Sequence, residues 1–364
     1  MYFDRHATFS AILRFTTNAL QYYTIPMSKQ KNITRYLHSS GWLEQLGCSK
    51  LTDISFLASG EYNENWIITA APDTANSPPK RYVFRINHGS QLGLENEQIA
   101  YEFSVLCALK SSGVTPLPYL VDTQAGNEDA AFDRGILLME YLEGTPIDYT
   151  RDMEHAAQIF AAVHTQPVPN EHMFITQKNP VADIVTESLG LLSRFADHPK
   201  TDKRRKLENY SKQVSELSEQ YASVFAAEPQ ILVNTEVNSG NFIINRTQNT
   251  AHLVDWEKAV VSSRYQDLGH FIVPTTTLWK TDFTASREQR LHFLTQYKKY
   301  ADLPQSLEEL SVLTDVLEKT ILLRGLSWCY MAWYEYTQHD RALKNNDTFA
   351  TIERYLDNLE WFLQ

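Results

Sequence analysis

The sequence predicts an α+β protein in which a small, strand-rich part is followed by a larger and mostly helical part. Before residue 142, short apolar runs bounded by turn residues recur, as expected of strands. From residue 151 onward, long segments carry apolar residues at helical spacing. A chain of 364 residues that is 43% hydrophobic can supply a core for each part. We therefore expect an N-terminal extension over residues 1–30, an N-lobe over 31–142 and a C-lobe over 143–364.

In the N-lobe, one strand and the helix after it predict a buried ion pair. Alternation along the strand 81–87 places Val83, Arg85 and Asn87 on one face. In the following helix, Glu102 lies within the apolar stripe, whereas Glu97 is on the opposite face and is expected to be solvated. A carboxylate that faces a core needs a partner, and Arg85 is the natural one. The expected elements are, in order, a helix (32–48), two strands around a turn (51–57 and 66–69), a strand (81–87), a helix (94–110) and a buried strand (135–144).

The C-lobe is expected to contain helices over 151–165, over 187–225 and from 287 to the end. The charged run 200–206 is interpreted as a solvated loop or a helix start. The aromatic residues of 327–336 suggest either a cage for a quaternary ammonium group or the core-facing side of a late helix, and we favour the helix core.

The stretches 233–244 and 253–257 carry the chemistry. A polar loop contains Glu236 and, five residues on, Asn241; a hairpin follows, whose second strand ends in Asp255. Strand pairing across the turn 247–250 would bring Asn241 and Asp255 side by side. Their oxygens suit Mg²⁺, and Glu236 lies one loop away as a general base, an arrangement suited to moving a phosphoryl group. From spacing alone, a polar hairpin without a metal is the alternative.

These stretches resemble motifs of the aminoglycoside phosphotransferase and choline kinase family. Residues 234–241 (NTEVNSGN) are similar to its His-Gly-Asp-x4-Asn motif, and 254–257 (VDWE) to its Ile-Asp-Trp/Phe-Gly/Glu motif. The segment 265–271 looks like the one that carries a structural aspartate, here Asp267. The resemblance covers roughly residues 50–275. Two positions depart from the family: Asn234 replaces the usual histidine, and Glu236 replaces the catalytic aspartate, with its carboxylate about one methylene further out.

The resemblance implies a two-lobed protein-kinase-like fold, ATP and Mg²⁺ as cofactors, and transfer of the γ-phosphate to a hydroxyl of a small molecule. By the same resemblance, His164 and Asp267 are structural, and Glu257 assists the metal or a cationic substrate. The implied catalytic residues are Glu236, Asn241 and Asp255, of which Asn241 and Asp255 hold the metal. The implied nucleotide-binding residues are Ser59 and Gly60 over the phosphates, Arg85 braced by Glu102 in place of the usual lysine, and the backbone of Glu140 and Leu142 beside the adenine.

The composition of the chain argues against several classes of partner and site. The net charge of −11 argues against nucleic acid and mildly favours neutral or cationic substrates. Three widely spaced cysteines indicate no disulfide framework or zinc site, and no apolar run reaches the ~20 residues of a membrane span. We expect a cytoplasmic protein without a signal peptide. Two alternatives stay open: a nucleotide-binding protein that has lost transfer activity, and an interaction protein on the same scaffold. Neither the substrate nor the oligomeric state is indicated.

Overall fold

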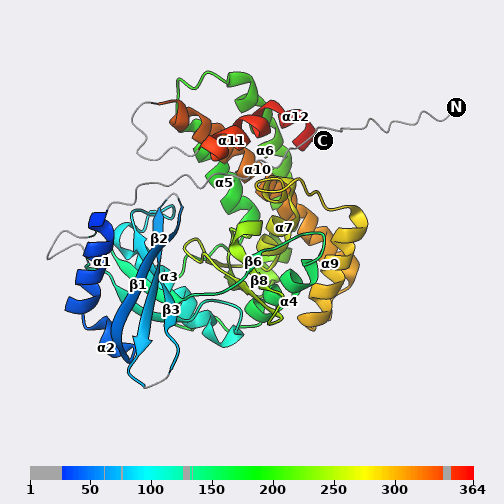
Figure 1. Ribbon diagram of the computed structural model, residues 1–364. Helices are drawn as coiled ribbons and strands as arrows, with labels where there is room; N and C mark the ends of the chain where they lie inside the picture. The colour runs from blue at the N-terminus through cyan, green and yellow to red at the C-terminus, as the bar shows by residue number, and fades with distance from the viewer. Residues whose placement is uncertain (1–26, 61, 75–76, 126–131, 133, 339–345) are drawn as a thin grey trace, which may run out of the picture.

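A five-stranded antiparallel sheet forms the first lobe of the computed structural model, which describes residues 27–60, 62–74, 77–125, 132, 134–338 and 346–364. The larger, helical lobe lies beside it (Figure 1). The strand order is β1-β2-β3-β5-β4. Most of the predicted extension, residues 1–26, falls outside the described residues. The strands are β1 (Cys48–Ser59), β2 (Asn63–Pro72), β3 (Lys80–Asn87), β4 (Pro118–Asp122) and β5 (Ile136–Glu140).

The alternation of β3 divides its side chains between two hydrophobic cores. Tyr82, Phe84 and Ile86 pack with α1 (Met27–Ser39) and α2 (Trp42–Gln45) in the smaller core. Val83, on the opposite face, belongs to the larger core, which includes α3 (Gln98–Leu109) and continues into the helical lobe. Arg85 shares this second face. The strand therefore presents its charged residue toward α3 and the other lobe, as the alternation predicts.

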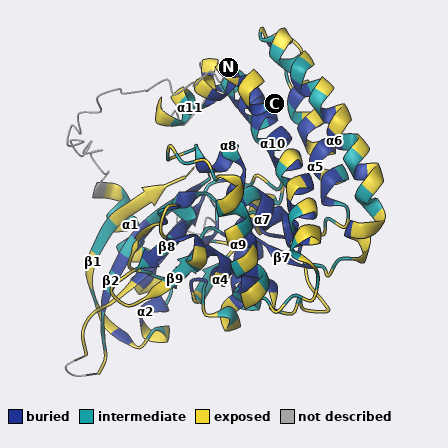
Figure 2. Ribbon diagram, turned by 90° about the vertical axis from the view of Figure 1, so that its right-hand side faces the viewer, coloured by how far each residue is buried: buried dark blue, intermediate teal, exposed yellow. Residues whose placement is uncertain are grey.

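The helical lobe is built around α10, which spans 31 residues and packs against α5, α6, α7, α9 and α11. Figure 2 shows α6 at the edge of the molecule with exposed residues along its length. The helices of this lobe are α4 (Met153–His164), α5 (Pro180–Ser193), α6 (Thr201–Ala227), α7 (Tyr265–Ile272), α8 (Pro274–Thr277), α9 (Arg287–Tyr300), α10 (Leu307–Thr337), α11 (Asn346–Asp357) and α12 (Leu359–Phe362). Its short strands are β6 (Thr145–Pro146), β7 (Ile231–Val233), β8 (Phe242–Asn245), β9 (Thr250–Leu253) and β10 (Val260–Ser262).

The structure corrects some expected elements and confirms others. The single helix expected over 187–225 is two helices, α5 and α6, and the charged run 200–206 is the start of α6. Strand β4 was not predicted, because its first residue, Pro118, indicated only a turn. Tyr330 and Tyr336 of the aromatic-rich segment are buried in the larger core, which confirms the core-facing interpretation. The predicted lobe boundary at 142 lies between β5 and β6.

The cysteines and the hydropathy of the helices can also be described. Cys48, Cys107 and Cys329 are all free. Within the described residues, no helix is both long enough and apolar enough to span a membrane.

Candidate active site

The loop 234–241 joins β7 to β8, and a buried aspartate fixes its beginning. Asp267 of α7 accepts hydrogen bonds from the backbone N–H groups of Asn234 and Thr235, each at 2.9 Å. Nε2 of His164 lies 3.2 Å from the same carboxylate, and its Nδ1 lies 2.9 Å from the hydroxyl of Tyr297. Burial lowers the pKa of His164 in spite of the nearby Asp267. Asp267 thus holds the start of the loop, and His164 contacts Asp267 from behind it.

Asn234 ties this loop to the segment that carries Asp255. Its amide oxygen accepts from the N–H of Glu236 at 3.0 Å, and its Nδ2 donates to the carbonyl of Asp255 at 2.9 Å. Thr235 and Asp255 both have φ of 65°, a conformation that non-glycine residues adopt rarely and at a cost in energy. The bonds from Asn234 and Asp267 offset that cost, so the loop and the segment are held in one defined arrangement.

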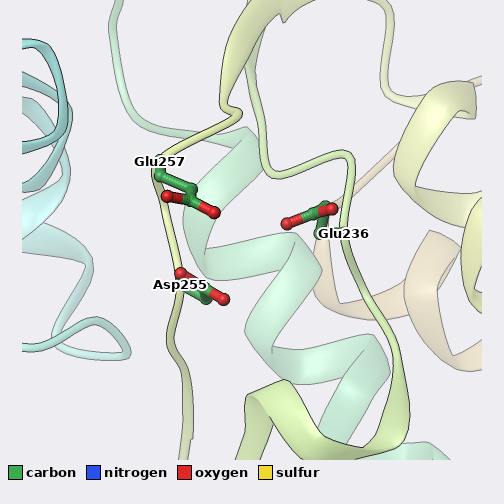
Figure 3. Close-up of side chains that lie close together, drawn as sticks. All are labelled: Glu236, Asp255 and Glu257. Atoms are coloured by element: carbon green, nitrogen blue, oxygen red, sulfur yellow. The ribbon is translucent and has the colours of Figure 1, made fainter. Parts of the chain in front are cut away.

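Three carboxylates converge beside this loop. Glu236, Asp255 and Glu257 each offer an oxygen within 4.8 Å of the others and point toward a common point (Figure 3). Nζ of Lys258 lies 3.0 Å from Oε1 of Glu236. Glu257 is buried, and its burial, followed by the charges of Asp255 and Glu236, raises its pKa to about 9. Carboxylate oxygens are the ligands that Mg²⁺ prefers, and a cation bound among these three groups would lower the raised pKa of Glu257.

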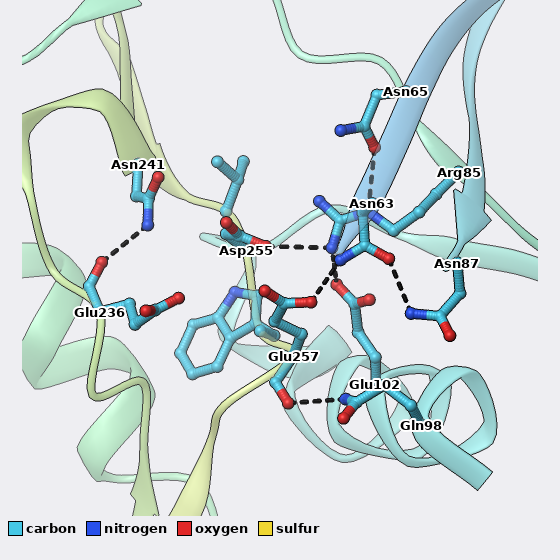
Figure 4. Close-up of polar contacts among 12 residues, drawn as sticks. Asn63, Asn65, Arg85, Asn87, Gln98, Glu102, Glu236, Asn241, Asp255 and Glu257 are labelled. Atoms are coloured by element: carbon cyan, nitrogen blue, oxygen red, sulfur yellow. Dashed lines mark hydrogen bonds and ion pairs between the residues drawn. The ribbon is translucent and has the colours of Figure 1, made fainter. Parts of the chain in front are cut away.

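The predicted hairpin is present, with β8 and β9 paired antiparallel from Phe242–Leu253 to Asn245–Thr250. The backbone N–H of Val254 donates to the carbonyl of Asn241 at 2.8 Å, so the far ends of the two strands do lie side by side. Nδ2 of Asn241 donates to the carbonyl of Glu236 at 2.7 Å (Figure 4). That bond orients the carboxamide and leaves its oxygen available as a ligand.

The predicted ion pair between Arg85 and Glu102 is confirmed. Nη1 of Arg85 lies 2.5 Å from Oε1 of Glu102 and 3.0 Å from Oδ1 of Asp255, and both partners of the first pair are almost fully buried. Nε of Arg85 donates to Asn65 at 2.9 Å. Burial disfavours the charged guanidinium, but the charges of Glu102 and Asp255 outweigh this effect and raise the pKa of Arg85. Arg85 of the first lobe is thus in direct contact with Asp255, a member of the carboxylate cluster of the second lobe.

A chain of buried amides also links the lobes, and sequence reasoning missed it. Asn63 donates to the Glu257 carboxylate and accepts from Asn87 at 3.0 Å, while Gln98 donates to the Glu257 carbonyl at 2.8 Å (Figure 4). The signal was in the alternation of two neighbouring strands. Asn63 pairs in register with Asn87, and Asn65 with Arg85, so four polar residues lie next to one another on one face of the sheet.

The remaining predicted nucleotide-binding residues lie at the turn after β1 and at the end of β5. Ser59 ends β1, and the N–H of Gly60 donates to the carbonyl of Asn63 at 2.9 Å, which closes the turn toward β2. A Cβ atom added at Gly60 would meet no atom within 4 Å, so the turn is open on this side. Glu140 ends β5, where its N–H donates to the carbonyl of Leu117 at 2.8 Å, and Leu142 follows in the linker. Their contacts with a nucleotide stay predictions.

A strand-rich lobe whose buried arginine meets an acidic cluster on a helical lobe defines a protein of the kinase-like class. Solved structures agree with this fold. The chain is similar to the ethanolamine kinase of Plasmodium vivax (TM-score 0.58, 14% identity, covering 88% of this chain and 85% of that one). It is also similar to the choline kinase of Cryptosporidium parvum Iowa II (0.56, 14%, 92% and 96%) and to a type I macrolide 2'-phosphotransferase (0.53, 14%, 89% and 96%).

A search of curated proteins finds no match to this sequence. The model of the phosphotransferase enzyme family (APH), in contrast, matches residues 53–310, which is more than half of the chain. The protein therefore belongs to the phosphotransferase enzyme family, and the resemblance of its motifs to that family is confirmed.

Proposed function

We propose that the protein is an ATP- and Mg²⁺-dependent kinase that transfers the γ-phosphate to a hydroxyl of a small molecule. The proposal rests on one observation: the carboxylates of Glu236, Asp255 and Glu257 lie close together, and Arg85 contacts Asp255. Phosphoryl transfer needs a base at the acceptor, a cation at the phosphates and ligands for a metal, because catalysis consists mainly of positioning and charge stabilisation. These residues supply all three within one small volume.

Glu236 is the proposed base. The acceptor hydroxyl gives its proton to the Glu236 carboxylate as its oxygen forms a bond to the γ-phosphorus. The bond from that phosphorus to the β–γ bridging oxygen breaks, and ADP leaves with the electron pair. Lys258 holds the carboxylate at 3.0 Å, and Asn234 fixes the backbone at its root. A positioned base of this kind contributes about 10²–10⁴ in rate.

Asp255 and Asn241 are the proposed metal ligands, and the donor set fits Mg²⁺ because it consists of hard oxygens, with the carboxylates of Glu236 and Glu257 close to Asp255. Glu257 reinforces the same site, since its raised pKa falls when a cation is bound beside it. Bound Mg²⁺ would neutralise phosphate charge during transfer. Asn241 is oriented for this role by its bond to the backbone of Glu236.

Arg85 is the proposed phosphate-binding cation. Its Nη2 takes no part in the bonds to Glu102, Asp255 and Asn65, so it is left for a phosphate oxygen. We propose that residues 31–142 bind the nucleotide, with Ser59 and Gly60 over the phosphates and the backbone of Glu140 and Leu142 beside the adenine. Residues 143–364 carry the catalytic loop and the acceptor site, and we propose that the protein acts in the cytoplasm.

The test is ADP release from Mg·ATP in the presence of pooled alcohols, amino alcohols, sugars and aminoglycosides. Wild type is compared with Glu236→Gln and Asp255→Asn, and with the matched control Glu97→Gln, whose side chain is exposed. Release that requires the pool, persists in the control and disappears in both site variants supports the proposal. Binding of Mg·ATP without turnover of any acceptor points instead to a nucleotide-binding protein without transfer activity. No binding at all points to an interaction protein.

A further inference from the structure

The proposed catalytic loop, residues 234–241, lies against two lysines from separate segments. Lys258 follows β9, and its Nζ is 3.0 Å from Oε1 of Glu236. Lys280 follows α8, and a Cβ atom added at Gly240 would lie 3.0 Å from its Nζ. Two ammonium groups therefore border the same short loop, one at the proposed base and the other at the turn before β8.

Arg324 reaches this loop from α10. Its Nη2 donates to the carbonyl of Thr235 at 3.2 Å. The position of Arg324 is set by close helix packing, because a Cβ atom at the neighbouring Gly325 would lie only 3.1 Å from Oγ1 of Thr275 in α8. Glycine lets α10 approach α8 this closely, and the approach carries the guanidinium to the loop.

Two cations at this loop lack an acidic partner among the described residues, in a chain whose net charge is −11. Within the described part of the chain, no carboxylate oxygen lies within 4.0 Å of the charged nitrogens of Lys280 or Arg324, and Lys258 is paired only with Glu236. His270 is close to Arg324, with its Nδ1 3.4 Å from Nη2 of that residue. Burial, followed by the charges of Arg324 and Lys258, lowers its pKa well below the ordinary range. Lys280 and Arg324 thus lie against the loop that carries the proposed base and form no ion pair with a described carboxylate.

These cations are separate from the one assigned to the nucleotide. Figure 4 shows Arg85 and Glu236 on opposite sides of Asp255. Arg85 belongs to β3 of the first lobe, whereas Lys280 and Arg324 contact the catalytic loop itself. They contact it at Gly240 and Thr235, on either side of Glu236 in the sequence.

We infer that the acceptor carries an anionic group, a carboxylate or a phosphate, in addition to the hydroxyl that is phosphorylated. Lys280 and Arg324 bind this group, and the pairing of Glu236 with Lys258 limits repulsion between the base and the anion. A cationic acceptor would instead meet two uncompensated positive charges. The inference rests on the proposed function, because it names the substrate class for the same site.

The experiment compares acceptors matched in size under Mg·ATP. One set contains glycerol, serinol, D-glycerate and glycerol 3-phosphate; the other contains glucose, glucosamine, gluconate and glucose 6-phosphate. We expect an anionic member to exceed the neutral and cationic members of its set in kcat/KM by about tenfold or more, as one charge-assisted contact provides. The carboxylate and phosphate members then identify which anion the site prefers.

Substitution of Lys280 tests whether this residue causes the preference for an anionic acceptor. Lys280→Gln should raise KM for the preferred anion by about tenfold with little change in kcat, because the contact is to the bound anion rather than to the transferring phosphoryl group. Lys212→Gln makes the same charge change on the exposed face of α6 and should leave KM unchanged. A preference for the neutral or cationic members, or an unchanged KM in Lys280→Gln, overturns the inference.

Equilibrium binding separates this inference from the proposed function. If no acceptor is turned over, calorimetric titration of D-glycerate and of glycerol 3-phosphate is carried out on wild type and Lys280→Gln in the presence of Mg²⁺ and a non-hydrolysable ATP analogue. Binding of an anion to wild type that weakens in Lys280→Gln supports the anion site, while the absence of turnover counts against transfer. Anion binding no stronger than that of glycerol refutes the anion site whatever the outcome for transfer.

Discussion

Replacing Glu102 with glutamine tests the centre of the site, because it removes a charge and keeps the shape. In the wild type, Glu102 and Arg85 are paired at 2.5 Å with 2% and 6% of their side chains exposed. Breaking a buried pair by neutralising one partner costs about 3–5 kcal/mol, since the other charge stays buried. Asp255 remains 3.0 Å from Arg85 and retains part of the compensation, so we expect about 3 kcal/mol, the lower end of that range.

This cost corresponds to a measurable change in the thermal midpoint. With about 2.1 cal/mol/K of unfolding entropy per residue, 364 residues give about 0.76 kcal/mol/K, so about 3 kcal/mol lowers Tm by about 4 °C. Differential scanning calorimetry of Glu102→Gln is compared with Glu97→Gln, an exposed glutamate just before the same helix. The control is expected to stay within about 0.5 kcal/mol of the wild type, as most surface substitutions do.

A functional measurement on the same proteins completes the test. Glu102→Gln should also weaken Mg·ATP binding, because Arg85 is no longer held in place and pairs with Asp255 alone. Equal midpoints for Glu102→Gln and Glu97→Gln would refute the claim that this pair is buried and compensated. A lowered midpoint with unchanged Mg·ATP affinity would keep the structural pair but remove Arg85 from the nucleotide site.

Three further substitutions address the loop. Glu236→Asp withdraws the carboxylate by about 1 Å from its present position and from Lys258, so ADP release should fall about a hundredfold; a rise would mean that the native residue is the weaker base. Asn234→Ala removes the side-chain bonds to the Glu236 N–H and to the Asp255 carbonyl, and should lower kcat in the same assay with little change in nucleotide affinity. Burial and neighbouring cations lower the pKa of His270, so the stability it contributes is lost as the pH falls below 6.5, by up to about 1.4 kcal/mol per pH unit. The Tm of the wild type should therefore decrease more than that of His270→Gln between pH 7.5 and 5.5. Equal decreases in the two proteins would contradict a lowered pKa of His270.

The parts of the site that sequence reasoning anticipated depend on local periodicity. Arg85 could be placed on the inner face of its strand from alternation alone, and Glu102 on the inner face of its helix from 3.6-residue spacing. The β8–β9 hairpin was equally local, since its strands are separated only by a short turn. In each case a few neighbouring residues determine which way a side chain points.

The missed contacts join residues that are far apart in the chain. Asn63 and Glu257 are separated by 194 positions, and Arg324 and Thr235 by 89, so no pattern around either residue indicates its partner. The placement of α10 depends on how two helices pack, which in turn depends on Gly325. Such contacts follow from the assembled lobes: strand alternation indicates that Asn63 faces inward, but it does not indicate which residue of the other lobe Asn63 contacts.

The structure shows how Asn234 and Glu236, the two departures from the family motif, fit into the loop. A neutral histidine offers one donor and one acceptor through its two ring nitrogens, and the carboxamide of Asn234 offers the same pair, used here for the Asp255 carbonyl and the Glu236 N–H. The longer side chain of Glu236 brings a second requirement, because an extra rotatable bond must be fixed before the carboxylate can act as a base. Lys258 meets that requirement with its contact at 3.0 Å. The substitutions at 234 and 236 therefore preserve the hydrogen bonds and the carboxylate of the loop, and the ion pair with Lys258 fixes the longer side chain that we propose as the base.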